Sequence, residues 1–360
     1  NLIAVTAGRP PSRRAALTLA AHRSPEIGTS SVPGLSVTGF VDRVGDPVPL
    51  VAADGSSHPA DRLVATAIEA MTREARPQRR PDAAAVAVPA YWPESRVAAL
   101  RARVPHLIVV SDAVAALTAL QANPGLPARG VVALCDFGAT GSSITLADAD
   151  GFAAIGPTVR YDDFSGDLVD QSVLRRVLTD LDVDPCGTSE VTSLTDLREQ
   201  CRAAKERLSL ETATGIVSAG TTIRFTRADL ASAGGGPPDG FVQVLLDTLH
   251  RSGIAPAQLA AIATVGGGAR IPVVTQRLSE VMRRPVVTTV AAQVAAAAGA
   301  ELLALRGTEL ETRTTVVPAS DAAETGAAAV PLAWTAETVD LAAAEFVQPV
   351  YNSAQARPEV

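Results

Sequence analysis

The chain has 360 residues, 47% of them hydrophobic and 19% charged, which is enough for two lobes or domains with a sizeable core. The net charge is -7 and the basic residues are scattered, which argues against nucleic acid as the main partner. Cys135, Cys186 and Cys201 form no CxxC pair, and no histidine stands at ligand spacing from them. We therefore expect buried thiols in a reducing compartment, the cytoplasm, and no metal site built from cysteine and histidine.

The ends of the chain and its most apolar stretch bear on membrane association. The start has no basic-then-apolar layout of a leader peptide, and the absence of methionine at Asn1 suggests a trimmed N-terminus. The stretch from Val286 to Leu305 is mostly alanine but carries Gln293 and Glu301. We predict a packed helix there, and no membrane span within this chain.

Short strands alternate with helices in the first 130 residues. The helix signal is clearest around Leu63, Ile68 and Met71, which recur at helical spacing. Apolar runs bounded by turn residues predict strands over 1–6, 15–20, 37–44, 48–52, 83–88 and 107–110. Helices are expected over 59–76, 93–104 and 112–122.

The same alternation continues to residue 305. Strands are expected over 131–136, 143–147, 214–218, 221–226, 259–265 and 286–289, and helices over 164–181, 193–209, 241–252, 272–282 and 291–305. From Gly307 on, Thr, Pro, Ala and Glu dominate and periodicity is lost, so residues 307–360 are expected to form a linker or flexible tail. The pattern before the tail predicts an α/β fold with mixed sheets.

The segment from Asp136 to Gly141, Asp-Phe-Gly-Ala-Thr-Gly, follows one apolar strand and precedes another. A tight hairpin of small residues lets backbone N–H groups approach phosphate oxygens. An aspartate at the strand end can hold a hydrated Mg²⁺ beside those phosphates. An ordinary glycine-containing hairpin turn would show the same pattern.

A second glycine run, Gly266 to Gly268, lies between a strand and a helix and is followed by Ala269 and Arg270. Three glycines allow close approach of the backbone to a flat ligand and tolerate positive φ. Arg270 could stack on a base or donate hydrogen bonds to it. The run fits neither a Walker loop nor GxGxxG, and a tight strand-to-helix loop explains it equally well.

The order of these motifs and their flanking segments resembles the ATPase domain of the heat-shock protein 70 (DnaK) family over roughly residues 1–306. Further matching segments are Val88 to Trp92 for Val-Pro-Ala-Tyr-Phe, Ser111 to Ala116 for Asn-Glu-Pro-Thr-Ala-Ala, Ser165 to Asp167 for Gly-Gly-Glu, Leu197 to Ser209 for the adenosine-clamping helix, Phe225 to Leu230 for Thr-Arg-Ala, and Val265 to Pro272 for Val-Gly-Gly-Ser-Thr-Arg-Ile-Pro. The resemblance implies an actin-like fold, in which two lobes enclose a central nucleotide cleft. Lobe I would be 1–130 with 290–306 returning to it, and lobe II 131–289 with an outer subdomain at about 193–255.

The resemblance also implies a site for ATP or ADP with Mg²⁺. Asp112 and Asp136 would be the catalytic residues, with Asp136 holding the metal through water. The implied nucleotide-binding positions are Gly138, Ala139, Thr140, Gly141, Ser165, Gly166, Lys205, Ser209, Gly266, Gly267, Gly268 and Arg270.

Several positions that would touch the nucleotide differ from the family. No lysine stands at the family's catalytic position, since Lys205 is the only lysine and belongs to the other lobe; Arg43 is the nearest substitute. Asp112 is one methylene shorter than the family's catalytic glutamate, and a positioned water is sensitive to such a shift. Arg202 and Glu206 stand where the family has its ribose-binding Glu and base-stacking Arg. The first phosphate loop is represented by its final Asn alone, at Asn1.

Two functions fit this pattern. One is an ATP-binding, chaperone-related domain, an ATP hydrolase if active, that has no usual peptide-binding domain because residues 307–360 contain no run of alternating strands. The other is a degenerate pseudo-ATPase that serves as a protein-interaction or scaffolding module. A protein partner is expected in both. A sugar or acetate kinase of the same superfold is disfavoured, because lobe I contains neither a substrate base nor a sugar loop.

Overall fold

The computed structural model describes residues 2–3, 12–20, 23–28, 34–76, 78, 83–181, 190–218, 221–233 and 237–315. The chain divides into two compact units, Asn1–Thr315 and Val316–Val360, and the second lies outside the described residues. Asn1, Cys186 and the turn expected at 219–220 also lie outside them, as does the tail beyond Thr315. No described helix combines the length and apolarity needed to span a bilayer.

The N-terminal part is built on a small antiparallel sheet with β3 (Ala16–Ala20) between β4 (Arg23–Ile27) and β5 (Leu35–Thr38). Helix α1 (Ala60–Ala75) packs its apolar face into the same hydrophobic cluster, which includes the fully buried Leu17 and Phe40. Two further strand pairs complete this part: β1 (Leu2–Ile3) with β2 (Ser12–Arg13), and β6 (Leu50–Val51) with β7 (Ser57–His58).

A parallel strand pair places the first acidic residue of the expected site. β8 (Ala85–Val88) pairs with β9 (Ile108–Ser111), and α2 (Glu94–Arg103) connects them. Ser111 then caps α3 (Asp112–Ala122): its Oγ accepts a hydrogen bond from the N–H of Ala113 at 3.2 Å. Serine is a preferred capping residue because its oxygen satisfies an otherwise unpaired N–H of the first turn. Asp112 is therefore fixed as the first residue of α3.

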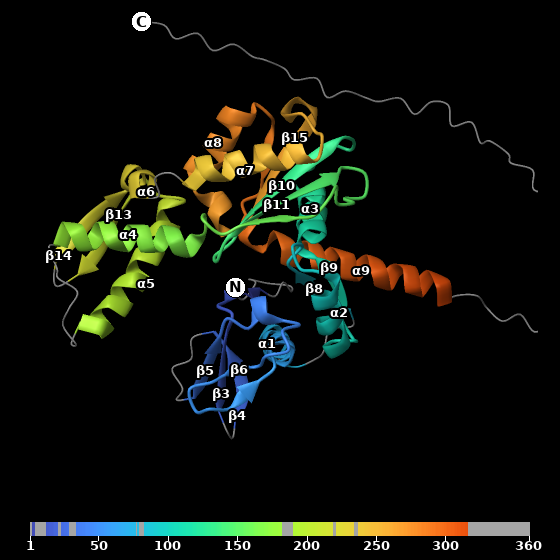
Figure 1. Ribbon diagram of the computed structural model, residues 1–360, viewed down its shortest axis with the longest axis horizontal. Coiled ribbons are helices and arrows are strands. Elements are labelled where there is room, and N and C mark those ends of the chain that lie inside the picture. The colour runs from blue at the N-terminus through green and yellow to red at the C-terminus, as the bar shows by residue number, and fades with distance from the viewer. Residues whose placement is uncertain are drawn as a thin grey trace, which may run out of the picture. The chain divides into compact units, whose positions relative to one another are not determined.

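The largest sheet has the strand order β12-β11-β10-β15-β16 (Figure 1). Its strands are β10 (Val131–Phe137), β11 (Ser142–Asp148), β12 (Val159–Tyr161), β15 (Leu259–Val265) and β16 (Val286–Thr288). β10 and β11 form an antiparallel hairpin, while β15 lies parallel to β10. Asp136 stands opposite Ser143 on one side and Val265 on the other, at the end of the central strand.

The remaining helices and one hairpin form separate groups. They are α4 (Gly166–Leu181), α5 (Glu190–Leu208), α6 (Arg227–Ala233), α7 (Pro237–Arg251), α8 (Pro272–Met282) and α9 (Ala295–Thr315), with the hairpin β13 (Ala213–Ser218) and β14 (Thr221–Thr226). Helices α7 and α8 contact the sheet, whereas α4, α5, α6 and the hairpin pack against one another, and α9 packs on α3. Three aromatic rings anchor the packing: Phe137 lies 4.7 Å from Phe241 and 5.7 Å from Phe164, centroid to centroid. This aromatic cluster holds Phe137, the residue that follows Asp136, in the core.

The α/β class with mixed sheets is confirmed, and most expected elements are found at nearly the expected bounds. Five strands and helices were not expected: β2, β4, β7, β12 and α6. The strand expected over 37–44 ends at Thr38, and Val41–Arg43 forms a 3-10 turn instead. The final helix runs to Thr315, beyond the tail start expected at Gly307. α9 packs against α3 so closely that a Cβ at Gly299 would overlap the Ala115 carbonyl (Figure 1).

Candidate functional site

Two acidic side chains from different parts of the fold lie near each other. Asp112 begins α3, and its Oδ1 accepts a hydrogen bond from the N–H of Ala90 at 2.9 Å. Burial, followed by the charge of Asp136, raises the Asp112 pKa to about 7. Burial likewise raises the Asp136 pKa to about 6, against an opposing effect of the Arg160 charge. Raised pKa values of this size identify a pair of carboxylates that would gain from a nearby cation.

The turn that follows Asp136 is closed by its own backbone. The N–H of Gly138 donates to the Gly141 carbonyl at 3.0 Å. A Cβ at Gly138 would lie 2.8 Å from that same carbonyl oxygen, so the tight closure requires glycine. Ala139 and Thr140 form the tip, and Thr140 is exposed. The four positions expected to meet phosphate therefore form one compact turn beside the acidic pair.

The N-terminus of α4 is attached to this turn through backbone bonds. The N–H of Gly166 donates to the Gly138 carbonyl at 3.0 Å, and the N–H of Asp167 donates to the Ala139 carbonyl at 2.8 Å. The Oγ of buried Ser165 accepts from the N–H of Leu168 at 3.2 Å and so caps the helix. The positive end of the α4 dipole thus lies next to the turn, a position that favours anions.

Lys205 of α5 contacts the same region from the other side. Its Nζ lies 2.8 Å from Asp170 Oδ1 and donates to the Gly166 carbonyl at 3.1 Å. The two side chains are only 12% and 17% exposed. Burial raises the Asp170 pKa, although Lys205 opposes the shift. Lys205 is therefore already engaged in holding α5 to α4.

The second glycine run approaches Asp136 directly. Gly266 has φ 83°, and a Cβ there would overlap both Asp136 Oδ1 and the Phe137 carbonyl. At Gly268, a Cβ would lie 2.8 Å from Phe137 Cβ, whereas a Cβ at Gly267 would meet no atom within 4 Å. Arg270 ends the short 3-10 segment Gly267–Arg270. The run is therefore a close-packed strand-to-helix loop whose first glycine lies against Asp136.

Two of the expected positions are less closely tied to this centre. Ser209 follows α5, and its carbonyl accepts from Arg227 Nη2 at 3.4 Å. Within the described residues, no hydrogen bond joins Ser209 or Arg270 to the turn or to the acidic pair. The structure thus groups Asp112, Asp136, the Gly138–Gly141 turn, Ser165, Gly166, Lys205 and Gly266.

Sequence reasoning did not identify Arg160, which lies on the unexpected strand β12. Its Nη2 donates to Thr140 Oγ1 at 3.2 Å, and its Nε donates to Asp162 Oδ1 at 2.8 Å. Its guanidinium carbon lies 5.0 Å from the centroid of the Tyr91 ring. The only signal in the sequence was the alternation Val-Arg-Tyr. A run of three residues is too short to predict a strand or the direction of its side chains.

The positions that differ from the family form local pairs. Arg43, the expected lysine substitute, donates through Nε and Nη2 to Asp46 Oδ2 at 3.1 and 2.9 Å. Arg202 and Glu206 pair with each other along α5, with Nε and Oε1 3.4 Å apart. Each side chain thus has a partner on its own element or turn.

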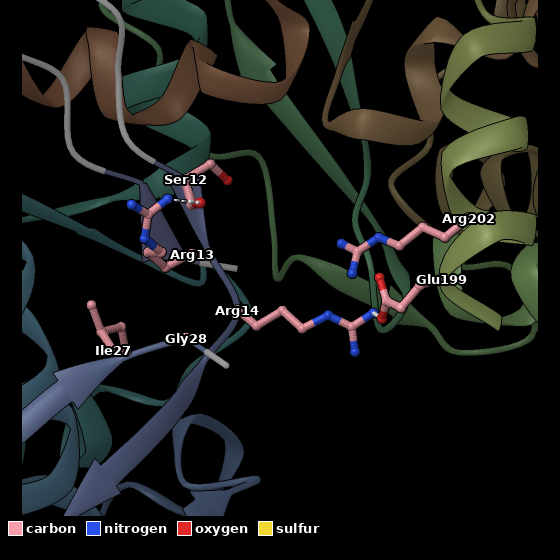
Figure 2. Close-up of a pocket in the computed structure, with 7 residues that line it drawn as sticks. All are labelled: Ser12, Arg13, Arg14, Ile27, Gly28, Glu199 and Arg202. Carbon is pink, nitrogen blue, oxygen red and sulfur yellow. Dashed lines mark hydrogen bonds and ion pairs between the residues drawn. The ribbon is translucent and has the colours of Figure 1, made fainter. Parts of the chain in front are cut away.

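A polar pocket of about 350 Å³ lies beside the exposed face of α5 (Figure 2). Its lining residues are Ser12, Arg13, Arg14, Ile27, Gly28, Glu199 and Arg202. Figure 2 shows Arg14 and Glu199 pointing toward each other, and their Nη2 and Oε1 atoms lie 3.3 Å apart. None of the expected site residues lines this pocket.

The residues present fit a cation that keeps most of its water ligands better than one coordinated entirely by protein side chains. Among the described residues, no group of three or more histidine, cysteine, aspartate or glutamate side chains could hold a metal. Mg²⁺ keeps several of its waters and is commonly held by one or two carboxylates together with substrate phosphates. The Asp112 and Asp136 carboxylates, beside a turn and a helix N-terminus, match that requirement.

Comparison with known families agrees with this geometry. Residues 40–317 match the family model described as Hsp70 protein, which is well over half of the chain. No curated protein matches the chain. The matched range includes the acidic pair, both glycine runs and the helices around them. The chain therefore belongs to the Hsp70 family, as an Hsp70-like module with the actin-like ATPase fold.

Proposed function

We propose that this module binds ATP or ADP with Mg²⁺ at the corner formed by Asp112, Asp136 and the Gly138–Gly141 turn, and that it hydrolyses ATP weakly. The observation that carries the proposal is the acidic pair itself. Two carboxylates with raised pKa values face a closed glycine turn and a helix N-terminus. A bound cation would stabilise the charged form of the two carboxylates. A phosphate would be favoured beside the glycine turn and the helix N-terminus.

The proposed division of labour follows the position of each group. Asp136, at the end of the central strand, would hold hydrated Mg²⁺, which would neutralise phosphate charge when bound. The remaining N–H groups of the turn would donate to phosphate oxygens, and the positive end of the α4 dipole would favour the phosphate charge. Asp112 would orient water, but its carboxylate already accepts from the Ala90 N–H at 2.9 Å. Because its side chain is short, we expect hydrolysis to be slow. The reaction rate falls steeply when the attacking water is misplaced by about an ångström.

The adenosine would lie toward α5 and the second glycine run. Lys205, Ser209 and the segment Gly266–Arg270 are the proposed contacts there. Lys205 supports this proposal less than the family pattern suggests, because its Nζ is engaged by Asp170 at 2.8 Å. We therefore expect the phosphates to contribute more to affinity than the base.

A pseudo-ATPase that acts as an interaction or scaffolding module is the second candidate. It is favoured by Arg43, whose guanidinium is bound to Asp46 instead of standing free as a phosphate ligand. Under this candidate, Asp136→Ala would leave function in cells intact. Loss of function in that variant, with normal protein levels, would favour nucleotide binding.

The remaining expectations stay proposals of the same kind. The return of 290–306 to lobe I is supported by the packing of α9 on α3. The boundary between 1–130 and 131–289 separates the clusters around Leu17 and Phe137, but a third cluster crosses it and joins Leu117 to Val132. A chaperone-related role and a protein partner rest on the family alone, and a cytoplasmic location rests on the cysteines of the sequence.

Calorimetry with Mg-ATP and with Mg-ADP tests the proposal. We expect the wild-type chain to bind both, and Asp136→Asn to weaken binding by about tenfold or more, because a ligand of the hydrated cation is lost. Asp247→Asn is the matched control, since Asp247 is exposed on α7 and its carboxylate accepts from Gln243 Nε2 at 2.9 Å. Absence of heat with the wild-type chain at high micromolar concentration would reject the proposal.

A further inference from the structure

The guanidinium of Arg160 lies against the tip of the glycine turn. A Cβ at Gly141 would overlap it, with the Arg160 Nη2, Cζ and Nε as the three nearest atoms. Nη2 also donates to Thr140 Oγ1 at 3.2 Å. The absence of a side chain at Gly141 is therefore what allows a cation to rest on this turn.

The position of Arg160 is fixed from two further directions. Its guanidinium carbon lies 5.0 Å from the centroid of the Tyr91 ring, within the range of a cation–π interaction. The Tyr91 hydroxyl in turn donates to Asp42 Oδ1 at 3.2 Å. The Arg160 Nε donates to Asp162 Oδ1 at 2.8 Å. These contacts hold the side chain in place while leaving it 25% exposed.

The same side chain acts on the acidic pair. The charge of Arg160 lowers the pKa of Asp136 and that of Asp112, in both cases against the larger effect of burial. A guanidinium has five N–H groups. Hydrogen bonds within the described residues use only two of them. Donors therefore remain on a cation that faces the corner where phosphate would lie.

Two other candidate cations, Arg43 and Lys205, are committed elsewhere. Arg43 donates to the Asp46 carboxylate and to the Val48 carbonyl, which lie three and five residues further along the chain. Lys205 is paired with Asp170 in a mostly buried contact. Arg160 is more exposed than Lys205, and its ion-pair partner Asp162 is 77% exposed and thus well screened by water.

We propose that Arg160 is a phosphate-binding residue of this site, in which it supplies the positive charge that Arg43 does not provide. The proposal rests on nucleotide binding at the Asp136 corner and assigns to β12 a role in recognising the terminal phosphates. The planar guanidinium can donate two parallel hydrogen bonds to phosphate oxygens. The stacking on Tyr91 keeps this donor face oriented before the ligand arrives.

Calorimetry with three probes tests the assignment: inorganic tripolyphosphate, Mg-ATP and adenosine. We expect Arg160→Gln to weaken tripolyphosphate and Mg-ATP by about tenfold to a hundredfold, the range for a lost charge-assisted contact, and to leave adenosine unchanged. Arg160→Lys should recover part of the loss, because it restores the charge without the fork. Arg101→Gln is the control, since Arg101 is an exposed residue of α2 that pairs with Glu94 at 3.3 Å.

The outcomes separate this assignment from the proposed function. If Arg160→Gln binds Mg-ATP as tightly as the wild type, or more tightly, the assignment is overturned while nucleotide binding stands. If the wild type binds tripolyphosphate but not Mg-ATP, and Arg160→Gln loses that binding, Arg160 is upheld and the adenosine contacts are rejected. If the wild type binds neither probe, both proposals fall. Should Arg160→Gln not fold, Arg160→Met, which also removes the charge, takes its place, and an affinity equal to the wild type would overturn the assignment.

Discussion

The two sides of the candidate site are built differently. On the phosphate side, backbone groups make the structure: Gly138 closes the turn, and the N–H groups of Gly166 and Asp167 bind its carbonyls at 3.0 and 2.8 Å. On the adenosine side, side chains would have to make the contacts. There Arg202 and Glu206 pair with each other, with side chains 21% and 64% exposed.

This difference explains how a family member can diverge unevenly. A backbone turn keeps its donors and its shape through many substitutions, provided that its glycines remain. Recognition by side chains is lost with single replacements, and Arg202 and Glu206 differ from the residue types that the family pattern has at these positions. We therefore expect a site that recognises phosphates first and the base weakly, and three variants test that contrast.

The largest effect is expected at Gly266, where the second glycine run meets the acidic pair. Gly266→Ala places a Cβ against the Phe137 carbonyl, which cannot move without breaking β10, and it does so at φ 83°. We expect a loss of about 3 kcal/mol in the free energy of unfolding, from backbone strain and overlap together. Urea unfolding followed by circular dichroism measures it.

The neighbouring glycine provides the matched control. A Cβ at Gly267 meets nothing within 4 Å, and this residue lies in a 3-10 turn. Gly267→Ala should change stability by less than about 1 kcal/mol, because alanine adopts that conformation without strain. Equal losses in the two variants would show that the close approach to Asp136 and Phe137 is not a constraint.

An intermediate effect, of opposite sign, is expected at Asp112. Its pKa is raised from 3.8 to about 7, so the native state binds more protons than the unfolded state between those values. Stability must therefore fall as pH rises from about 4 to about 7. Asp112→Asn removes this penalty and keeps the Oδ1 that accepts from Ala90. We expect it to stabilise the protein by about 1–3 kcal/mol at pH 8, since one pKa unit is about 1.4 kcal/mol.

The pH profile distinguishes this electrostatic effect from simple repacking. Measured without divalent cations, the gain in Asp112→Asn should shrink steadily as the pH is lowered from 8 to 4. The control Asp247→Asn, on an exposed helix face, should show no such trend. A gain that stays constant across this range would contradict the raised pKa of Asp112.

Much of the phosphate side could be predicted from the sequence because its signals are local. The bounds of α3 and α8 follow from the residues that begin and end them, Asp112 to Ala122 and Pro272 to Met282. The glycine turn follows from an apolar strand on each side. Local turn and capping chemistry is readable without knowing any tertiary contact.

The features that escaped prediction depend on tertiary contacts. β12 is only Val159–Tyr161 and owes its place to pairing with β11, so Arg160 could not be assigned to the site. α9 continues through Gly307 because packing overrides weak helix propensity there; a Cβ at Gly307 would lie 3.3 Å from Ile108 Cδ1. The local pairing of Arg43 with Asp46 likewise became visible only in three dimensions.

The smallest effect on stability is expected on the adenosine side, from exchanging Arg202 and Glu206. The double variant Arg202→Glu/Glu206→Arg keeps an i,i+4 pair on α5 and places glutamate N-terminal to arginine, the better orientation on a helix. Stability should change by no more than about 1 kcal/mol, because the pair is partly exposed, although the Arg202 charge also acts on Asp170. The exchange also restores the residue types that the family pattern has at these positions.

If the adenosine side has lost only side-chain contacts, Mg-ATP should bind several-fold tighter while tripolyphosphate binding stays constant. Unchanged Mg-ATP affinity would show that the backbone on this side has diverged as well.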